Sequence, residues 1–256
     1  MFIRGDSTAT LNDGDVTLCS VEELVLQHYK ENGYSHGVHS EGSIVCTLVG
    51  LLFWDIIYES EVGDAFLSPF QAVPLDFHTQ DFYRSRQEAI ERRLECVRSW
   101  SCEAVIDHVT RVWHDKKGQT SLVAWDRFAD VDTIQGLLLC IPPSVMAAVS
   151  HRLLRDYRHF RSGFPDLTVW NPVNKVKFAT NYVPKANVCS TFRPSQTWRI
   201  VEVKGPNDRL STKQILWLDF LVSNGVEAEV CHVEGTTAHL PNRTTMDLFG
   251  NCYDLN

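Results

Sequence analysis

A strand, a helix and a second strand follow one another in the last quarter of the chain, and they constrain the fold most. Residues 198–203 and 228–233 are rich in apolar and β-branched side chains, which predicts two strands. Between them, Ser211 and Gln214 have the spacing of a capping box, and an amphipathic helix follows. A helical crossover between strands of one sheet makes them parallel. The sequence therefore predicts an α/β fold.

Composition and hydrophobic pattern divide the whole chain into four ranges. Residues 1–18 are polar and predict a disordered lead-in, and residues 19–161 carry mainly helical patterns. Residues 162–234 hold the predicted strands, with a long loop expected at 171–197, and residues 235–256 read as a loose polar tail. We expect a mixed sheet core with a helical N-terminal half. The helices are expected at 20–31, 43–58, 82–112, within 119–141, and at 144–161.

Composition limits the classes of function. The formal net charge of −8 argues mildly against a nucleic-acid partner, although carboxylates that hold metal ions would also contribute to it. The eight cysteines form no CxxC pair, so a zinc ribbon is not expected, and we interpret them as reduced core residues. The most apolar stretch, residues 44–57, is too short to span a bilayer, and no secretory signal is visible. We expect no membrane partner.

Three ionisable residues flank the predicted strands. Asp166 opens the strand at 167–170, and Glu202 lies 36 residues further on, with Lys204 after it. Alternate residues of a strand point to the same face, so Glu202 and Lys204 lie side by side while Val203 points into the core. The alternative is an exposed strand end with a surface Glu–Lys pair that contributes little to stability.

This residue set suits the hydrolysis of phosphodiesters. Carboxylates such as Asp166 and Glu202 bind one or two Mg²⁺ or Mn²⁺ ions, and the carbonyl of Val203 could add a ligand. The ions activate a water molecule and stabilise the leaving oxygen, and Lys204 could orient the water or offset negative charge. Strand, strand and amphipathic helix in this order outline a restriction-endonuclease-like fold of the PD-(D/E)xK type.

The run from Val201 to Ser211, followed by Lys213-Gln214 and Trp217, closely resembles the VRR-NUC nuclease family. Within that family it is similar to the eukaryotic branch that repairs DNA interstrand crosslinks, and the resemblance covers about residues 20–234. It implies a nuclear, structure-specific hydrolase of phosphodiesterase I type with 5′-to-3′ exonuclease and 5′-flap endonuclease activity. Branched or flapped DNA is the implied substrate.

The resemblance also implies roles for two further residues. Glu41 occupies the place of a glutamate that completes the family's set of metal ligands; by itself it would be a first-turn residue favoured by the helix dipole. Gln214 is implied to support the active site, and it can also be the capping partner of Ser211. His36 and His39 lie near Glu41, but no second ligand pair for zinc is apparent.

Basic residues near these positions are candidates for phosphate contacts. A stripe is expected on the helix leading into Asp166, and two more cations follow the second catalytic strand. The alternative is a solvated cationic face. The four DNA-binding candidates are Arg158, Arg161, Arg209 and Lys213.

The sequence also departs from the family pattern. The loop 171–197 looks long, and no segment resembles the family's upstream zinc-finger, SAP-type or helical-repeat regions, through which repair proteins are expected to bind. The resemblance implies that a helical half of this kind blocks the dimerisation seen in smaller members, so we expect a monomer. The alternatives are a homodimeric junction-resolvase-like endonuclease and a non-catalytic DNA-binding module.

Overall fold

The structure is a computed structural model, and it describes most of the chain. The described residues are 2–4, 17–59, 62–63, 65–172, 197–240 and 243–254. Most of the expected loop 171–197 and residues 5–16 of the expected lead-in lie outside this range.

The chain forms two compact units. The first, here called the sheet unit, comprises residues 1–40, 165–170 and 199–256, and the second, the helical unit, comprises 41–164 and 171–198. The units thus do not follow the predicted ranges, because the first forty residues belong with the sheet. The reason is a short strand, β3 (His36–His39), which pairs antiparallel with β4 (Leu167–Trp170) across more than a hundred residues.

The sheet unit contains a five-stranded mixed sheet in the order β3-β4-β5-β6-β7. β5 (Trp198–Lys204) and β6 (Ala228–Leu240) are parallel, which confirms the prediction from the crossover helix. β7 (Arg243–Asp254) pairs antiparallel with β6, so strand structure occupies the range in which a loose tail was expected. A separate two-stranded sheet joins β1 (Phe2–Arg4) and β2 (Thr17–Cys19), so strand structure occupies part of the lead-in that was expected to be disordered.

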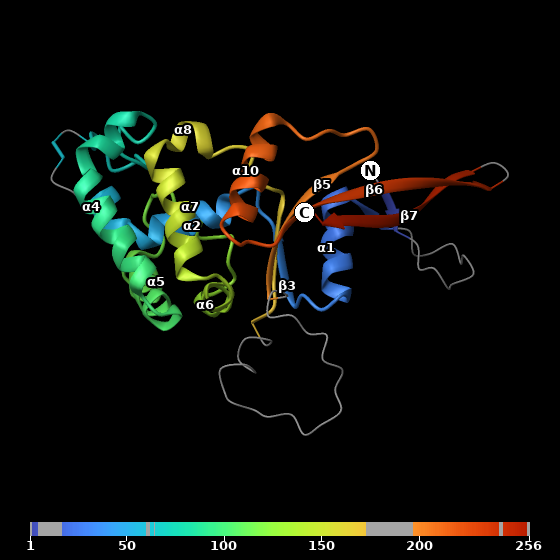
Figure 1. Cartoon of the computed structure of the whole chain (residues 1–256), viewed down its shortest axis with the longest axis horizontal. Coiled ribbons are helices and arrows are strands. Elements are labelled where there is room, and N and C mark those ends of the chain that lie inside the picture. The colour runs from blue at the N-terminus through green and yellow to red at the C-terminus, as the bar shows by residue number, and fades with distance from the viewer. Residues whose placement is uncertain are drawn as a thin grey trace, which may run out of the picture. The chain divides into compact units, whose positions relative to one another are not determined.

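Two helices cover opposite faces of this sheet (Figure 1). α1 (Val21–Glu31), with the predicted capping box between Ser20 and Glu23, packs Val25 and Tyr29 into the core. Val203 belongs to that core, so its neighbours Glu202 and Lys204 point to the other face. α10 (Thr212–Ser223) lies on that other face. The strand residues packed against α1 are Leu167, Val169, Val201, Val203, Cys231 and Val233.

The helical unit consists of shorter helices than expected (Figure 1). The run 43–58 breaks at Phe53, the run 82–112 is divided where Ser101 caps a new helix, and the run 144–161 breaks at Asp156. Side-chain oxygens of Ser101 and Asp156 accept backbone N–H groups at these starts, which is why helices begin there. The helices are α2 (Ser43–Leu52), α3 (Trp54–Tyr58), α4 (Gln80–Ser99), α5 (Cys102–Lys116), α6 (Val131–Cys140), α7 (Pro143–Arg155) and α8 (Tyr157–Phe160).

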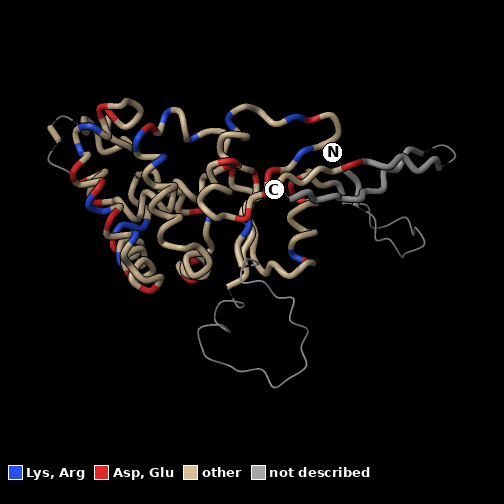
Figure 2. Tube along the Cα trace, in the orientation of Figure 1, with Lys and Arg blue, Asp and Glu red and all other residues tan. Residues whose placement is uncertain are grey.

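The helical unit has an apolar core and a surface of mixed charge. Leu48, Ile90 and Val109 from three of its helices are fully buried. Acidic and basic residues alternate along α4 (Figure 2), and pairs such as Arg92–Glu88 are largely exposed and so contribute little to stability. No single helix among the described residues is long and apolar enough to cross a membrane. The pair α6 and α7 would be, by length and composition alone, but a bend of 104° separates the two helices.

Candidate active site

Asp166 connects three strands at one edge of the sheet. It directly precedes β4, and its backbone carbonyl accepts a hydrogen bond from the N–H of Ser40, just after β3, at 2.9 Å. Its carboxylate accepts the N–H of Val203 in β5 at 2.8 Å. The carboxylate is therefore held beside the backbone of the strand that carries Glu202.

Glu202 and Lys204 form a buried ion pair on the face of β5 opposite to the Val203 side chain. The Lys204 ammonium lies 2.8 Å from one oxygen of the Glu202 carboxylate, and the two residues are 6% and 0% exposed. Burial excludes the alternative of a solvated surface pair. Taking two charges out of water is costly, so such a pair at the end of a strand requires further partners or a function.

Gln214 connects the Glu202 carboxylate to the start of α10. Its side-chain oxygen accepts the N–H of Ser211 at 2.8 Å, while the Ser211 hydroxyl accepts the N–H of Gln214. The predicted capping box is confirmed. The amide nitrogen of Gln214 also donates to Oε1 of Glu202, the oxygen that contacts the Lys204 ammonium. One side chain therefore both caps the helix and supports the carboxylate.

Burial and neighbouring charges shift the pKa values of both carboxyl groups. Burial raises the pKa of Glu202 to about 7, with Asp166 acting in the same direction and the Lys204 ammonium opposing it. Burial also raises the pKa of Asp166, against the N–H of Val203 and the positive charge of Lys204. Two carboxyl groups that both resist ionisation lie where a cation would stabilise their charged forms.

The second carboxylate oxygen of Glu202, which makes no hydrogen bond, bears on whether the site fits a divalent cation. This oxygen, Oε2, is fully buried and has no hydrogen-bond partner within the described part of the chain. Leaving a buried carboxylate oxygen unpaired is costly, unless an ion or proton satisfies it. Carboxylate oxygens are the ligands that Mg²⁺ and Mn²⁺ prefer, so the donor set fits such an ion.

Glu41 lies one residue beyond Ser40, in a strained turn. Its φ is 45° and that of Gly42 is 85°, so two successive residues have left-handed backbone conformations. A side chain at position 42 would meet the Cβ of Phe164 at 2.9 Å, which excludes any residue with a Cβ there. Backbone strain of this kind concentrates at functional sites.

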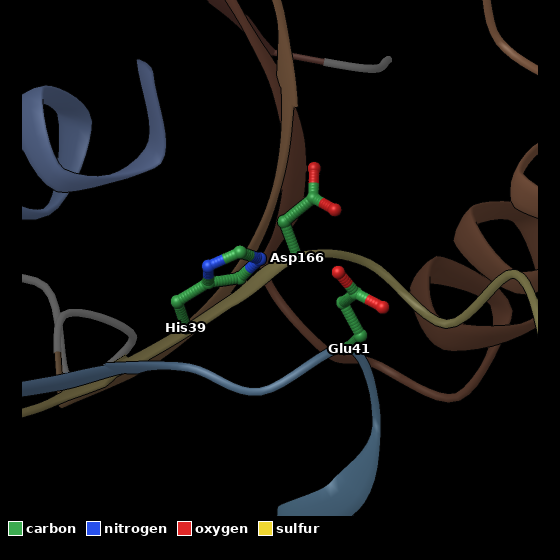
Figure 3. A group of neighbouring side chains, drawn as sticks. All are labelled: His39, Glu41 and Asp166. Carbon is green, nitrogen blue, oxygen red and sulfur yellow. The ribbon is translucent and has the colours of Figure 1, made fainter. Parts of the chain in front are cut away.

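Ligand atoms of His39, Glu41 and Asp166 all lie within 4.8 Å of one another (Figure 3). His39 was not predicted to be part of the site. The signal that could have indicated it is its position two residues before Glu41, on a strand whose register was not visible in the sequence.

The predicted DNA-binding residues are all exposed. Arg158 lies on α8 and Arg161 follows it, while Arg209 and Lys213 lie before and on the first turn of α10. Because the helix breaks at Asp156, Arg155 does not continue the helical face of Arg158, so the continuous basic stripe expected from the sequence is not formed.

Comparison with known proteins shows similarity over most of the chain. The VRR-NUC domain model matches residues 102–235. Fanconi-associated nuclease 1 of Danio rerio is 44% identical over 242 residues, covering 93% of this chain and 22% of that protein. The Homo sapiens protein of the same name is 42% identical over 222 residues, covering 86% and 20%. The chain thus spans about a fifth of the length of these relatives.

A solved structure is also similar in fold. The crystal structure of paFAN1 bound to 2nt 5′flap DNA with gap superposes with a TM-score of 0.71 at 29% identity. The match covers 87% of this chain and 36% of that chain. It supports the predicted restriction-endonuclease-like core with its attached helices.

Proposed function

The chain belongs to the VRR-NUC family of nucleases, and on that premise we propose that it is a metal-dependent hydrolase of phosphodiester bonds in branched DNA. The observation that carries the proposal is the buried Glu202 carboxylate, which keeps one oxygen unpartnered beside Lys204 and Asp166. Leaving this buried oxygen without a partner is costly, and a bound cation would satisfy it.

Asp166, Glu202 and Glu41, with the carbonyl of Val203, are the groups that would hold one or two Mg²⁺ or Mn²⁺ ions. When bound, such an ion lowers the pKa of a water molecule and offsets charge on the phosphate. Lys204, whose ammonium is buried and held 2.8 Å from Glu202, would position the attacking water. Gln214 keeps the Glu202 carboxylate in place through its amide.

The preferred substrate would be a 5′ flap, cut endonucleolytically and then degraded 5′ to 3′. The support is the similarity to paFAN1, a protein whose structures contain 5′flap DNA. Arg158, Arg161, Arg209 and Lys213 are exposed cations able to bind the phosphates of such a strand. The phosphodiesterase I type of activity is part of the same proposal.

Interstrand crosslink repair in the nucleus is the cellular role that we propose. The name of the Fanconi-associated relatives supports it. Repair proteins are the further class of partner that we propose for this role.

The test is cleavage of a 5′-end-labelled flap by the chain with Mn²⁺, alongside Asp166→Asn. We expect cleavage by the native chain and a loss of at least about a hundredfold in the variant, because one ligand of the ion loses its charge. Asp219→Asn, at an exposed position of α10, is the matched control and should cleave normally. Binding of the flap without any cleavage by the native chain would instead indicate a non-catalytic DNA-binding module.

A further inference from the structure

His39 is the one imidazole in the group of neighbouring side chains around Asp166, and the proposed mechanism does not use it. It ends β3, where the strand register places it opposite Leu167, the residue after Asp166. The two strands thus bring the imidazole and the Asp166 carboxylate to the same sheet edge (Figure 3).

The spacing suits a shared ion. A ring nitrogen of His39 and a carboxylate oxygen of Asp166 lie within 4.8 Å of each other. Two ligands on opposite sides of an ion, each about 2.1 Å from it, are about 4.2 Å apart. A small side-chain rotation would therefore bring both groups into one coordination sphere.

A second observation points to an ion at this place. The Oε2 atom of Glu202 is fully buried without a partner, and Asp166 is close enough to raise the pKa of Glu202. The backbone N–H of Val203, the residue after Glu202, donates a hydrogen bond to the Asp166 carboxylate. The imidazole therefore lies near a pair of carboxyl groups whose charged forms a cation would stabilise.

Resting on the proposed metal-dependent function, we propose that His39 donates a ring nitrogen to the ion at Asp166 and makes the site prefer Mn²⁺ to Mg²⁺. Mg²⁺ takes oxygen ligands and gives up its water molecules reluctantly, so an imidazole adds little to its binding. First-row transition ions accept nitrogen ligands more readily. His39 is thus a determinant of which metal the nuclease uses.

The chain offers a matched control on the same strand. His36 lies at the other end of β3, where its ring stacks on Trp170 with 5.3 Å between centroids and its Nδ1 is 2.8 Å from the Ser35 hydroxyl. It is not among the clustered ligand atoms at Asp166. Replacing His36 should change packing without changing the metal site.

The experiment measures Mn²⁺ binding by electron paramagnetic resonance, in the native chain, His39→Gln, His36→Gln and Asp166→Asn. Pulsed spectra of Mn²⁺ bound to the native chain should show coupling to an imidazole nitrogen. The coupling should disappear in His39→Gln and persist in His36→Gln. Competition with Mg²⁺ should show that the preference for Mn²⁺ falls roughly tenfold or more in His39→Gln only.

The outcomes separate this inference from the function on which it rests. Tight Mn²⁺ binding that depends on Asp166 but shows no imidazole nitrogen in the native chain would overturn the role of His39 alone. That spectrum is decisive even if His39→Gln does not fold. Failure of the native chain to bind Mn²⁺, or binding unaffected by Asp166→Asn, would overturn the metal-dependent function itself.

Discussion

At the residue scale, burial determines the chemistry of Glu202. In water this carboxyl group would be ionised well below neutral pH, but in the fold it is 0% exposed, and its pKa rises to about 7. The Lys204 ammonium stabilises the charged form without fully offsetting burial. The state of the metal-free site therefore changes within the physiological pH range.

The stability of the metal-free chain should fall as pH rises. The folded pKa of Glu202, about 7, lies above its ordinary value of 4.5, so the folded state binds the proton more tightly than the unfolded state. This contribution is fully present below about pH 4.5 and is lost as pH rises through about 7. Melting in EDTA at pH 5 and pH 8 should show a drop that is smaller in Glu202→Gln. Equal drops in both proteins would contradict the assignment.

Lys204→Met should separate catalysis from metal binding. The variant loses the ammonium that positions the water, and cleavage should fall by about a hundredfold or more. Mn²⁺ affinity should be retained, since the change removes a positive charge from beside the ion. Turnover and Mn²⁺ titration measure the two effects, with Lys30→Met, at an exposed position of α1, as the control. Parallel loss of Mn²⁺ binding would show that Lys204 acts structurally.

At the element scale, the groups that we propose to be catalytic lie at the ends of strands and helices. Asp166 precedes β4, Glu202 and Lys204 end β5, and Gln214 is on the first turn of α10. Side chains at such ends can face the sheet edge while the strand interior stays apolar. The same positions need unusual backbone conformations or helix caps, and their effect on the free energy of unfolding can be measured.

Glu41→Gly should be more stable than Glu41→Ala, although both should lose activity. The φ of 45° is unfavourable for any residue with a Cβ, by roughly 1 kcal/mol, and glycine does not incur this cost. Denaturant unfolding of the two variants measures the difference directly. If the alanine variant is as stable as the glycine variant, position 41 is not strained.

Gln214→Ala should cost more activity than its capping role explains. Loss of the cap should lower the free energy of unfolding by about 1 kcal/mol, as should Glu23→Ala in the equivalent box on α1. Only Gln214→Ala also removes the donor to Glu202, so only it should lower turnover. Equal turnover in these two variants would limit Gln214 to capping.

At the scale of the whole molecule, the sheet unit is assembled from three separate parts of the chain. Residues 1–40, 165–170 and 199–256 meet in it, while the helices between them form the other unit. From the family resemblance we expect these helices to block the dimerisation seen in smaller members.

The chain should be monomeric in solution. Light scattering coupled to gel filtration should give the mass of a single chain across a tenfold range of concentration, with and without Mn²⁺. A stable dimer would instead support the homodimeric, junction-resolvase-like alternative.

The sequence by itself determined the local elements and the pairing of Glu202 with Lys204, which we propose to be catalytic. The capping boxes at Ser20 and Ser211, the parallel strands around α10, and the shared face of Glu202 and Lys204 follow from spacing alone, because hydrogen bonds to nearby residues and strand alternation set them.

Only the tertiary structure decided the pairing of β3, the position of His39 and the pKa of Glu202. β3 is four residues long and is stabilised by β4 more than a hundred residues later, so its pattern was too short to recognise. That pairing brings His39 to Asp166, and burial by α10 and the sheet sets the pKa of Glu202. These properties arise from contacts between segments that are remote in sequence, and no local pattern encodes them.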